Sequence, residues 1–244
     1  MAKRALSVAL LLGGVNAACV NMRPPPAPLA PEMTSGAPDQ VWTARAGRRL
    51  TGRVVLGDGT LYGAGVDRKV YAVDLQSGGV RWSHRLAGLV AGGVVVSGDT
   101  VYAASSRPEG RVYAIDRETG KRLWRTATGP VGAPLSLAGN VLVALTQREE
   151  VVALEPATGK VRWRRKVGTS RIAAMPVAGA ALVVATVDSL FRLEAAGGKV
   201  THRTASPGTL VSPWIVYHGA LVGGTTDSQL VSINPQDLGL NWSV

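Results

Sequence analysis

Short stretches of alternating hydrophobic and polar positions follow one another along most of the chain, and turn-forming residues separate them. Residues 112–116 show the pattern well, because Tyr113 and Ile115 fall on one face of an expected strand, with the period of a half-buried strand. Residues 118–121 then have the composition of a tight turn. A second strand begins at residue 123, so the whole stretch predicts a β-hairpin.

The same hairpin pattern occurs five times, and its copies are spaced by 39 to 42 residues. The copies end on Trp82, Trp124, Trp163, His202 and Trp242. Eight residues before these positions stand Asp74, Asp116, Glu155, Glu194 and Asn234. A further tryptophan, Trp42, precedes the first copy, and in the last copy Leu238 stands where the turn glycine is expected, with Gly239 one place later. Five equal offsets indicate a tandem structural repeat.

Each repeat divides into four short strands, which predicts an all-β fold. In the second repeat we expect strands at residues 93–96, 100–104, 112–115 and 122–126. Four antiparallel strands in about 40 residues are the signature of a β-propeller blade. A blade cannot bury both of its faces alone, so blades stack on one another. The recurring acidic or amide residue and the recurring aromatic residue are therefore expected to dock one blade on the next.

The sequence does not decide whether the five repeats close into a ring. Residues 41–44 resemble an isolated fourth strand, and the last repeat already has a fourth strand of its own at residues 240–243. The chain could form an open or incomplete arc of five blades, a closed ring with a spare strand, or a short form of a longer propeller. We expect the open or incomplete arc, whose exposed end blade a partner would cover.

The N-terminus has the features of an export signal. Residues 1–18 combine Lys3 and Arg4 with an apolar run that is too short to span a bilayer as a stable helix. Cys19, the only cysteine in the chain, follows directly. This arrangement resembles a bacterial lipoprotein signal, in which the cysteine becomes the lipidated first residue. The alternative is ordinary secretion into the periplasm, with cleavage after residue 17 or 18.

Residues 19–40 are expected to be a tether, since their proline-rich sequence favours an extended spacer. Residues 41–244 then form the propeller. Under the lipoprotein resemblance, Val20 after the cysteine favours the outer membrane, on its periplasmic side, because an aspartate there would imply retention in the inner membrane.

Composition and charge narrow the function classes. With 46% hydrophobic residues the chain is globular rather than disordered, and its formal net charge is +11. Nucleic-acid binding is disfavoured by the export signal and by the scarcity of aromatic residues among the basic ones. His84, His202 and His218 do not have metal-ligand spacing, and we find no catalytic constellation.

The repeats resemble the tryptophan-docked blades of the PQQ-like, quinoprotein-type propeller family, whose pattern is roughly Ala-x-Asp-x-x-Thr-Gly-x-x-x-Trp. Matching segments begin at Ala72, Ala114 and Ala153, and those at Arg192 and Ser232 are degenerate. The resemblance covers residues 41–244 and is more specific for fold than for function.

Two branches of this family imply different functions. The first contains PQQ-dependent dehydrogenases, which bind the quinone and calcium; here no cluster of acidic residues has the density of a calcium site, so we expect no cofactor. The second is the BamB-type outer-membrane assembly lipoproteins, which have eight blades where this chain has five repeats. We therefore expect a non-catalytic, lipid-anchored scaffold for protein partners in the envelope, with outer-membrane β-barrel assembly as its setting. A quinoprotein-class cofactor-binding or dehydrogenase-related protein is the alternative.

Overall fold

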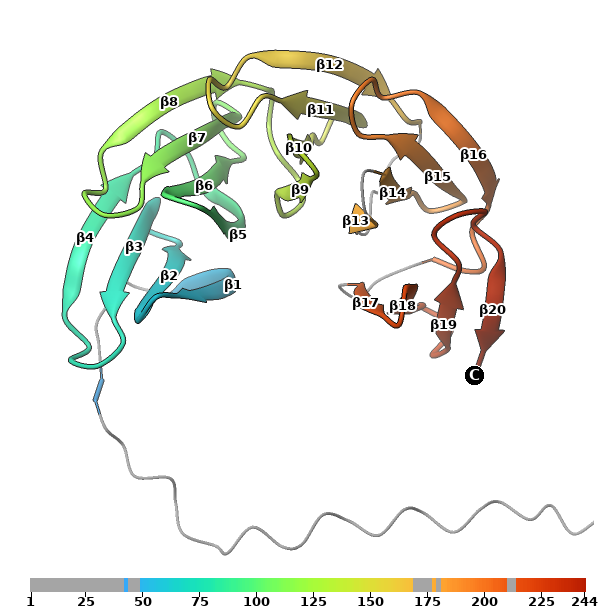
Figure 1. The fold of residues 1–244 in the computed structure, drawn as a ribbon, viewed down its shortest axis with the longest axis horizontal. Coiled ribbons are helices and arrows are strands. Elements are labelled where there is room, and N and C mark those ends of the chain that lie inside the picture. The colour runs from blue at the N-terminus through green and yellow to red at the C-terminus, as the bar shows by residue number, and fades with distance from the viewer. Residues whose placement is uncertain (1–41, 44–48, 169–176, 179–180, 210–213) are drawn as a thin grey trace, which may run out of the picture. The chain divides into compact units, whose positions relative to one another are not determined.

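The computed structural model describes residues 42–43, 49–168, 177–178, 181–209 and 214–244, and all regular elements in these ranges are β-strands (Figure 1). The strands fall into five groups of four, which we call blades 1 to 5. This arrangement confirms the prediction of an all-β propeller fold with four-stranded blades. The expectations for residues 1–41, which include Cys19, lie outside the described residues.

The blades have the following strands. Blade 1 consists of β1 (Leu50–Gly57), β2 (Thr60–Gly65), β3 (Lys69–Asp74) and β4 (Val80–Arg85). Blade 2 consists of β5 (Val90–Ser97), β6 (Thr100–Ser105), β7 (Arg111–Asp116) and β8 (Arg122–Ala127). Blade 3 consists of β9 (Ser136–Ala138), β10 (Val141–Leu145), β11 (Glu150–Leu154) and β12 (Val161–Lys166). Blade 4 consists of β13 (Val177–Ala178), β14 (Ala181–Ala185), β15 (Ser189–Glu194) and β16 (Val200–Ala205). Blade 5 consists of β17 (Ile215–Tyr217), β18 (Ala220–Gly224), β19 (Leu230–Ile233) and β20 (Leu240–Ser243).

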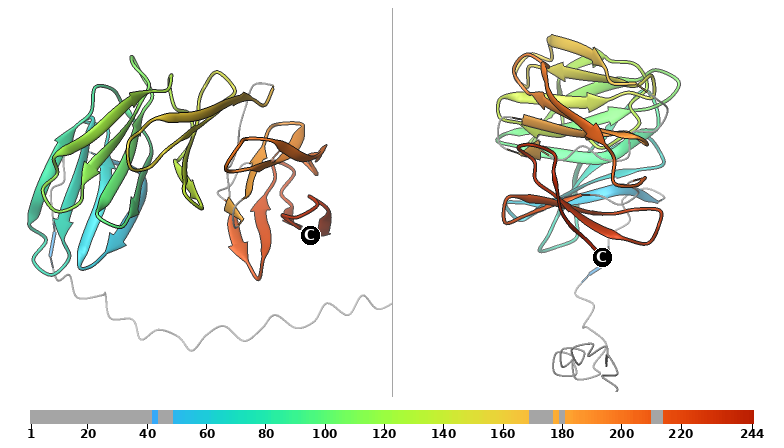
Figure 2. Two further views of the ribbon diagram at one scale, coloured as in Figure 1. Left: turned by 45° about the horizontal axis from the view of Figure 1, so that its top comes forward. Right: turned by 90° about the vertical axis from the view of Figure 1, so that its right-hand side faces the viewer.

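Within each blade the strands pair in chain order and antiparallel to their neighbours. The first strands lie on the inner side of the array and the fourth strands on the outer side (Figure 1). The strands of each sheet twist relative to one another, as the side views show (Figure 2). In all five blades the register between the third and fourth strands shifts at the same place, just before the recurring acidic or amide residue. In blade 2 the shift lies between Ala114 and Ile115, before Asp116. This regularity shows that the repeat in the sequence is a repeat in backbone geometry.

Blades 1 and 2 are joined into one eight-stranded sheet by a parallel pairing between β1 and β5 at Arg53 and Gly93. The two strands come so close there that a Cβ atom on Gly52 would lie 2.6 Å from the carbonyl carbon of Gly92. Gly52 has a φ of +73°, a conformation that also favours glycine. Glycine at this position therefore allows the inner strands of the first two blades to meet.

The hydrophobic core lies between the blades, in one cluster for each neighbouring pair. In β7, Tyr113 and Ile115 contact blade 1, whereas Val112 and Ala114 contact blade 3. All four side chains are at most 1% exposed. The prediction of a half-buried strand for residues 112–116 was therefore wrong, because a blade between two others buries both faces of its middle strands.

Blades 1 and 5 differ from the inner three. In the described part of the chain, no strand pairing joins blade 5 to blade 1. Most of the large hydrophobic side chains that are exposed belong to these two blades: Leu50, Val54, Leu56, Leu75 and Val80 in blade 1, and Ile215, Val216, Tyr217, Leu230, Leu240, Trp242 and Val244 in blade 5. Val80 and Leu240 match Val161 of blade 3, which is also exposed, so the clearest difference lies at Leu230, whose counterpart Val70 in blade 1 is fully buried.

The turn glycines provide a direct test of this packing. Gly159 has a φ of +70°, and a Cβ atom there would lie 2.6 Å from Cδ2 of Trp124 in the preceding blade. We expect Gly159→Ala to lower the free energy of unfolding by about 2–4 kcal/mol, since left-handed backbone strain and overpacking act together. Chemical denaturation followed by circular dichroism measures this change.

The matched control is Gly59→Ala. Gly59 has a φ of +68°, and no atom lies within 4 Å of the position that a Cβ atom would take, so alanine there adds backbone strain without a clash. The control should cost about 1–2 kcal/mol. Equal losses for the two variants would show that the contact between the glycine and the indole does not constrain the joint.

Candidate functional site: the joints between blades

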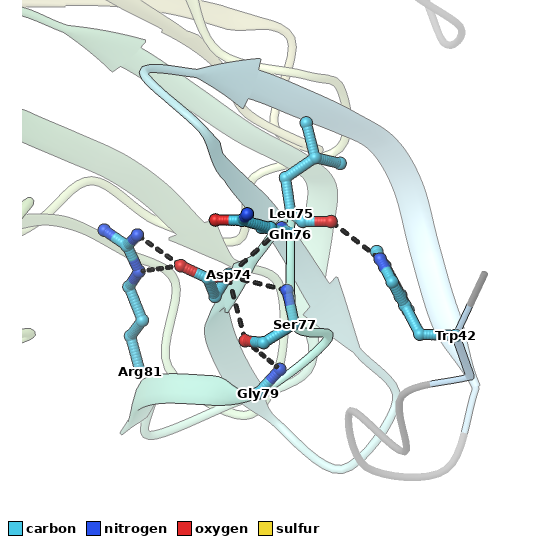
Figure 3. Close-up of polar contacts among 7 residues, drawn as sticks. All are labelled: Trp42, Asp74, Leu75, Gln76, Ser77, Gly79 and Arg81. Carbon is cyan, nitrogen blue, oxygen red and sulfur yellow. Dashed lines mark hydrogen bonds and ion pairs between the residues drawn. The ribbon is translucent and has the colours of Figure 1, made fainter.

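In the turn between the third and fourth strands, the side chain of the recurring acidic residue accepts hydrogen bonds from the residues that follow it (Figure 3). In blade 1, Asp74 Oδ1 accepts hydrogen bonds from the backbone N–H of Gln76 at 3.1 Å, from that of Ser77 at 2.8 Å and from the Ser77 hydroxyl at 2.9 Å. Oδ2 accepts from Arg81 Nε at 3.1 Å and also pairs with its Nη2. These donors, led by Arg81 and followed by Ser77, hold the pKa of Asp74 well below its usual value of 3.8.

The same turn recurs in the other blades with different side chains. Asp116 accepts from the backbone N–H of Thr119 at 2.7 Å and from its hydroxyl at 2.6 Å, and the hydroxyl contact is the main cause of its lowered pKa. Glu155 accepts from the Thr158 hydroxyl at 2.9 Å. The recurring acidic side chain therefore organises its own turn, as Asp commonly does.

The turns of blades 4 and 5 keep this backbone with weaker sequence signals. The carbonyl of Glu194 accepts from the N–H of Gly198 at 2.8 Å, and the carbonyl of Asn234 accepts from the N–H of Leu238 at 2.9 Å. Leu238 itself adopts the positive φ, at 63°, that glycine has in the other turns. Its side chain is 3% exposed, so burial of the leucine compensates for the strained backbone.

The turns of blades 2, 3 and 4 each receive a tryptophan from the preceding blade. The indole Nε1 atoms of Trp82, Trp124 and Trp163 donate to the carbonyls of Arg117, Pro156 and Ala195, in each case at 2.9 Å. Each accepting carbonyl belongs to the residue directly after the recurring acidic one. The indole lies over the turn glycine, so a Cβ atom on Gly120 would be 2.7 Å from Trp82 Cδ2. The two recurring positions are thus brought together across the joint, and not within one blade.

Trp42 makes the same contact with blade 1 (Figure 3). Its Nε1 donates to the carbonyl of Leu75 at 2.6 Å, and its ring lies against Gly78. Trp42 therefore takes the place that a tryptophan of a preceding blade would occupy. The bond is exposed to solvent, whereas its three counterparts are partly buried.

A second contact lies two residues after the tryptophan, at positions that the repeat pattern had not singled out. His84 Nδ1 lies 3.0 Å from the carbonyl of Gly120, and the Thr126 hydroxyl donates to the carbonyl of Gly159 at 2.7 Å. Burial lowers the pKa of His84, which favours the neutral ring with Nδ1–H as the donor. The fixed offset from Trp82 and Trp124 is the signal that could have revealed this pair.

The joint between blades 4 and 5 departs from the expectation for His202. The His202 ring is exposed, and its Nδ1 lies 3.3 Å from the hydroxyl of Thr201 in its own strand. Arg192 spans this joint instead: its Nε donates to the carbonyl of Pro235 at 3.1 Å and its Nη2 to Gln236 Oε1 at 3.2 Å. Pro235 follows Asn234, so its carbonyl is the counterpart of those that accept from the tryptophans. An imidazole is too short to replace an indole there, and the longer guanidinium reaches across from the third strand.

Trp242 has no partner blade among the described residues. Its side chain is 44% exposed, and it is paired only through the backbone of its own sheet, opposite Ser232. The remaining histidine, His218, makes an edge contact with the ring of Tyr217 at 4.3 Å between centroids. The docking role expected for Trp242 is therefore unfilled within blades 1 to 5.

Two further observations concern other kinds of site. Within the ranges that the structure covers, no group of three or more His, Cys, Asp or Glu side chains is placed to hold a metal ion. The same ranges contain no helix with the length and apolar character needed to cross a membrane.

Comparison with known proteins places the repeats in a family. A family model described as outer membrane protein assembly factor BamB matches residues 34–175. No curated protein matches the chain. Among solved structures, BamB from Moraxella catarrhalis is 24% identical, with a TM-score of 0.65, over 80% of this chain and 61% of that one.

Two other solved structures have the same fold. The computationally designed Ika8 protein is 12% identical, with a TM-score of 0.68, and the match covers 80% of this chain and 61% of that one. The quinohemoprotein alcohol dehydrogenase ADHIIG from Pseudomonas putida HK5 is 16% identical, with a TM-score of 0.59, over 78% of this chain and 41% of that one. This chain thus spans about three fifths of the length of the first two, and these likenesses concern the fold alone.

The tryptophan joint can be tested by removing its hydrogen-bond donor. Trp82→Phe removes the donor to the Arg117 carbonyl and leaves part of the indole site empty. We expect the free energy of unfolding to fall by about 1–3 kcal/mol. Trp242→Phe, at an exposed indole without such an acceptor, should change it by less than about 0.5 kcal/mol. Equal effects in urea denaturation would contradict the assignment of Trp82 as a docking residue.

The acidic turn predicts a dependence of stability on pH. Because the folded protein lowers the pKa of Asp74 below 3.8, ionised Asp74 stabilises the fold above this pH, and that contribution is lost as the pH falls below it. Asp74→Asn keeps an acceptor for the turn but loses the pairing with Arg81. Its melting temperature should therefore lie below that of the unmodified protein at pH 5–7, and the difference should shrink under acid conditions. A difference that stays constant down to pH 2.5 would rule out this linkage.

Proposed function

The chain belongs to the family of the outer membrane protein assembly factor BamB, and from this membership we propose that it serves the assembly of outer-membrane β-barrel proteins as a lipid-anchored propeller scaffold. The match over residues 34–175 is the observation that carries the proposal. In this role the protein performs no chemistry, and binds partner proteins in the cell envelope through its loops and end blades.

The geometry of the joints supports a scaffold. The residues that recur from repeat to repeat are engaged in building turns and in docking blades, as the contacts of Asp74 and Trp82 show. The conspicuous acidic side chains Asp74 and Asp116 already accept several hydrogen bonds within their turns. They do not suit a calcium and quinone site, which needs carboxylate oxygens that are free to converge on one ion.

The anchor belongs to the same proposal. Export of residues 1–18 and acylation of Cys19 would attach the propeller to a membrane through the proline-rich segment at residues 19–40. Each buried methylene of an acyl chain contributes about 0.8 kcal/mol, so several chains hold a protein firmly. Because residue 20 is valine and not an aspartate that would imply retention in the inner membrane, the proposed location is the outer membrane, on its periplasmic side.

Fractionation and co-purification test the proposal together. The full chain, expressed in a Gram-negative bacterium, should fractionate with the outer membrane, and Cys19→Ala should move it to the soluble periplasmic fraction. Asn21→Ala, which leaves the cysteine in place, is the matched control. Mild-detergent purification of the unmodified protein should recover components of the β-barrel assembly machinery.

Two results would contradict it. A Cys19→Ala protein that stays in the membrane fraction would remove the lipid anchor from the proposal. A clear rise in melting temperature on addition of PQQ with calcium would favour the quinoprotein alternative over the scaffold.

A further inference from the structure

The fourth strands of blades 2 and 3, β8 and β12, carry a dense set of basic side chains on the outer side of the array (Figure 1). Residues 121–127 and 160–166 contain eight lysines and arginines and no acidic residue. All eight basic residues are exposed. We call these eight side chains the basic rim.

The two halves of the basic rim meet at the joint between blades 2 and 3. Arg164 donates from Nη1 to the carbonyl of Thr128 and from Nη2 to that of Ala127, both at 3.2 Å, where β8 ends. Among the described strands, β8 and β12 each pair with a neighbour on one side only, so their outer edges are open. The basic rim is therefore one continuous, accessible surface.

Most of these cations are not neutralised. Arg162 lies 3.5 Å from Glu155, and Arg164 lies 3.6 Å from Glu150, at the surface, where such ion pairs contribute little. The other six basic side chains take part in no ion pair among the described residues. Four carboxylates lie on the adjoining third strands and turns: Asp116, Glu118, Glu150 and Glu155. After all four are counted, the surface keeps an excess of four positive charges.

Protection of the strand edge does not account for this density of charge. A lysine or arginine on an outermost strand prevents pairing with another chain. The fourth strand of blade 4, β16, has only Arg203 for this purpose, and β20 of blade 5 has neither lysine nor arginine, whereas β12 alone has four. The basic rim therefore indicates a negatively charged partner.

Exposed apolar side chains alternate with these cations. Leu123 is 55% exposed and follows Arg122, and Val161 is 38% exposed and lies between Lys160 and Arg162. The surface of an anionic bilayer suits both kinds of side chain, because it has phosphates at the headgroups and an apolar layer beneath them. Guanidinium groups bind phosphate oxygens well, since their N–H donors match them in pairs.

A nucleic acid suits this surface less well. It has phosphates, but no apolar layer for Leu123 and Val161. The indoles of the two strands, Trp124 and Trp163, are held at the joints by their bonds to Pro156 and Ala195. They are therefore not available to stack on bases, as aromatic side chains do in proteins that bind single strands.

We propose that the basic rim is a contact surface for the headgroups of an anionic phospholipid bilayer, with Leu123 and Val161 entering the interfacial layer. The contact turns blades 2 and 3 towards the membrane. It rests on the proposed function only for the location of the protein beside a membrane, and it does not need the acyl anchor.

The contact is weak at the salt concentration of the cell. The Debye length is about 8 Å at 0.15 M salt and about 30 Å at 0.01 M, so attraction to the lipid surface is strong only in dilute salt. An unacylated protein is therefore still expected in the soluble fraction of cells. In an anchored protein the lipid surface is always near, and the contact then orients the propeller.

Flotation of the Cys19→Ala protein with lipid vesicles tests the contact without the anchor. In about 0.01 M salt the protein should float with vesicles of about 30% phosphatidylglycerol in phosphatidylcholine, and about 0.5 M salt should release it. Pure phosphatidylcholine vesicles should not bind it. Arg125→Gln combined with Arg165→Gln should lower the partition coefficient about fivefold for each cation removed.

The matched control is Arg85→Gln combined with Lys199→Gln. It changes the net charge equally, at two exposed residues outside the basic rim. Arg85 also lies on the side of β4 opposite to Trp82, which docks on blade 2. This control should lower the partition coefficient less than about twofold.

A fluorescent label shows which residues enter the bilayer. Cys19 is the only cysteine, so Leu123→Cys in the Cys19→Ala protein provides a single thiol for an NBD label. The fluorescence of this label should rise with phosphatidylglycerol vesicles and fall when the lipid carries a doxyl quencher. Asn140→Cys, at an exposed turn residue between β9 and β10, is the control, and its label should stay in water.

Three results would overturn the inference. The double variant in the basic rim could float as well as the protein that keeps these arginines, or the label at Leu123→Cys could stay in water. The protein could also bind heparin and not the vesicles, which would assign the basic rim to an acidic macromolecule. None of these results bears on the acyl anchor or the scaffold, because fractionation and co-purification test those separately.

Discussion

One kind of hydrogen bond, from an indole N–H to the carbonyl after a turn acid, holds blade 1 on blade 2, blade 2 on blade 3 and blade 3 on blade 4. It needs a tryptophan at the centre of the fourth strand, a turn glycine with positive φ and a carboxylate or amide that shapes the turn. The indole also fills the space between two sheets, where its area contributes more than the bond itself. A change in any of the three components therefore disturbs two blades at once.

The position of this bond explains which parts of the structure the sequence could predict. Equal offsets between Asp116, Gly120 and Trp124 in successive copies identify the hairpin, because turn and strand are local in sequence. The local pattern of residues 112–116 indicated burial on one face only, and burial of Ala114 on the other face follows from the stacking of blades that the repeat implies. A small residue such as alanine indicates that another sheet packs closely against the strand, but it does not indicate which neighbouring blade supplies that sheet.

The replacement of a docking tryptophan by a different residue is harder to predict from the sequence than the position of the joint. Arg192 replaces the missing indole at His202 by reaching the Pro235 carbonyl from a different strand. No offset along the sequence connects these residues, because the contact depends on the length of a guanidinium side chain across two packed sheets. His84 and Thr126 do share an offset of two residues from a tryptophan, but their residue types differ although both reach the carbonyl of a turn glycine.

Because every blade repeats the same hydrophobic positions, blades 1 and 5 carry them on their outer faces as well. A closed propeller uses each blade face once, whereas blades 1 and 5 are not paired with each other in the described part of the chain. Within the described residues, the face of blade 5 that points away from blade 4 keeps two hydrophobic positions of an inner joint, Leu230 and Trp242, and both are exposed. A joint with a tryptophan is selective because the indole needs a carbonyl, a glycine and an apolar surface together. A facing surface that lacks any one of these would leave the indole N–H or the apolar area uncompensated, which is why these joints hold one blade on the next.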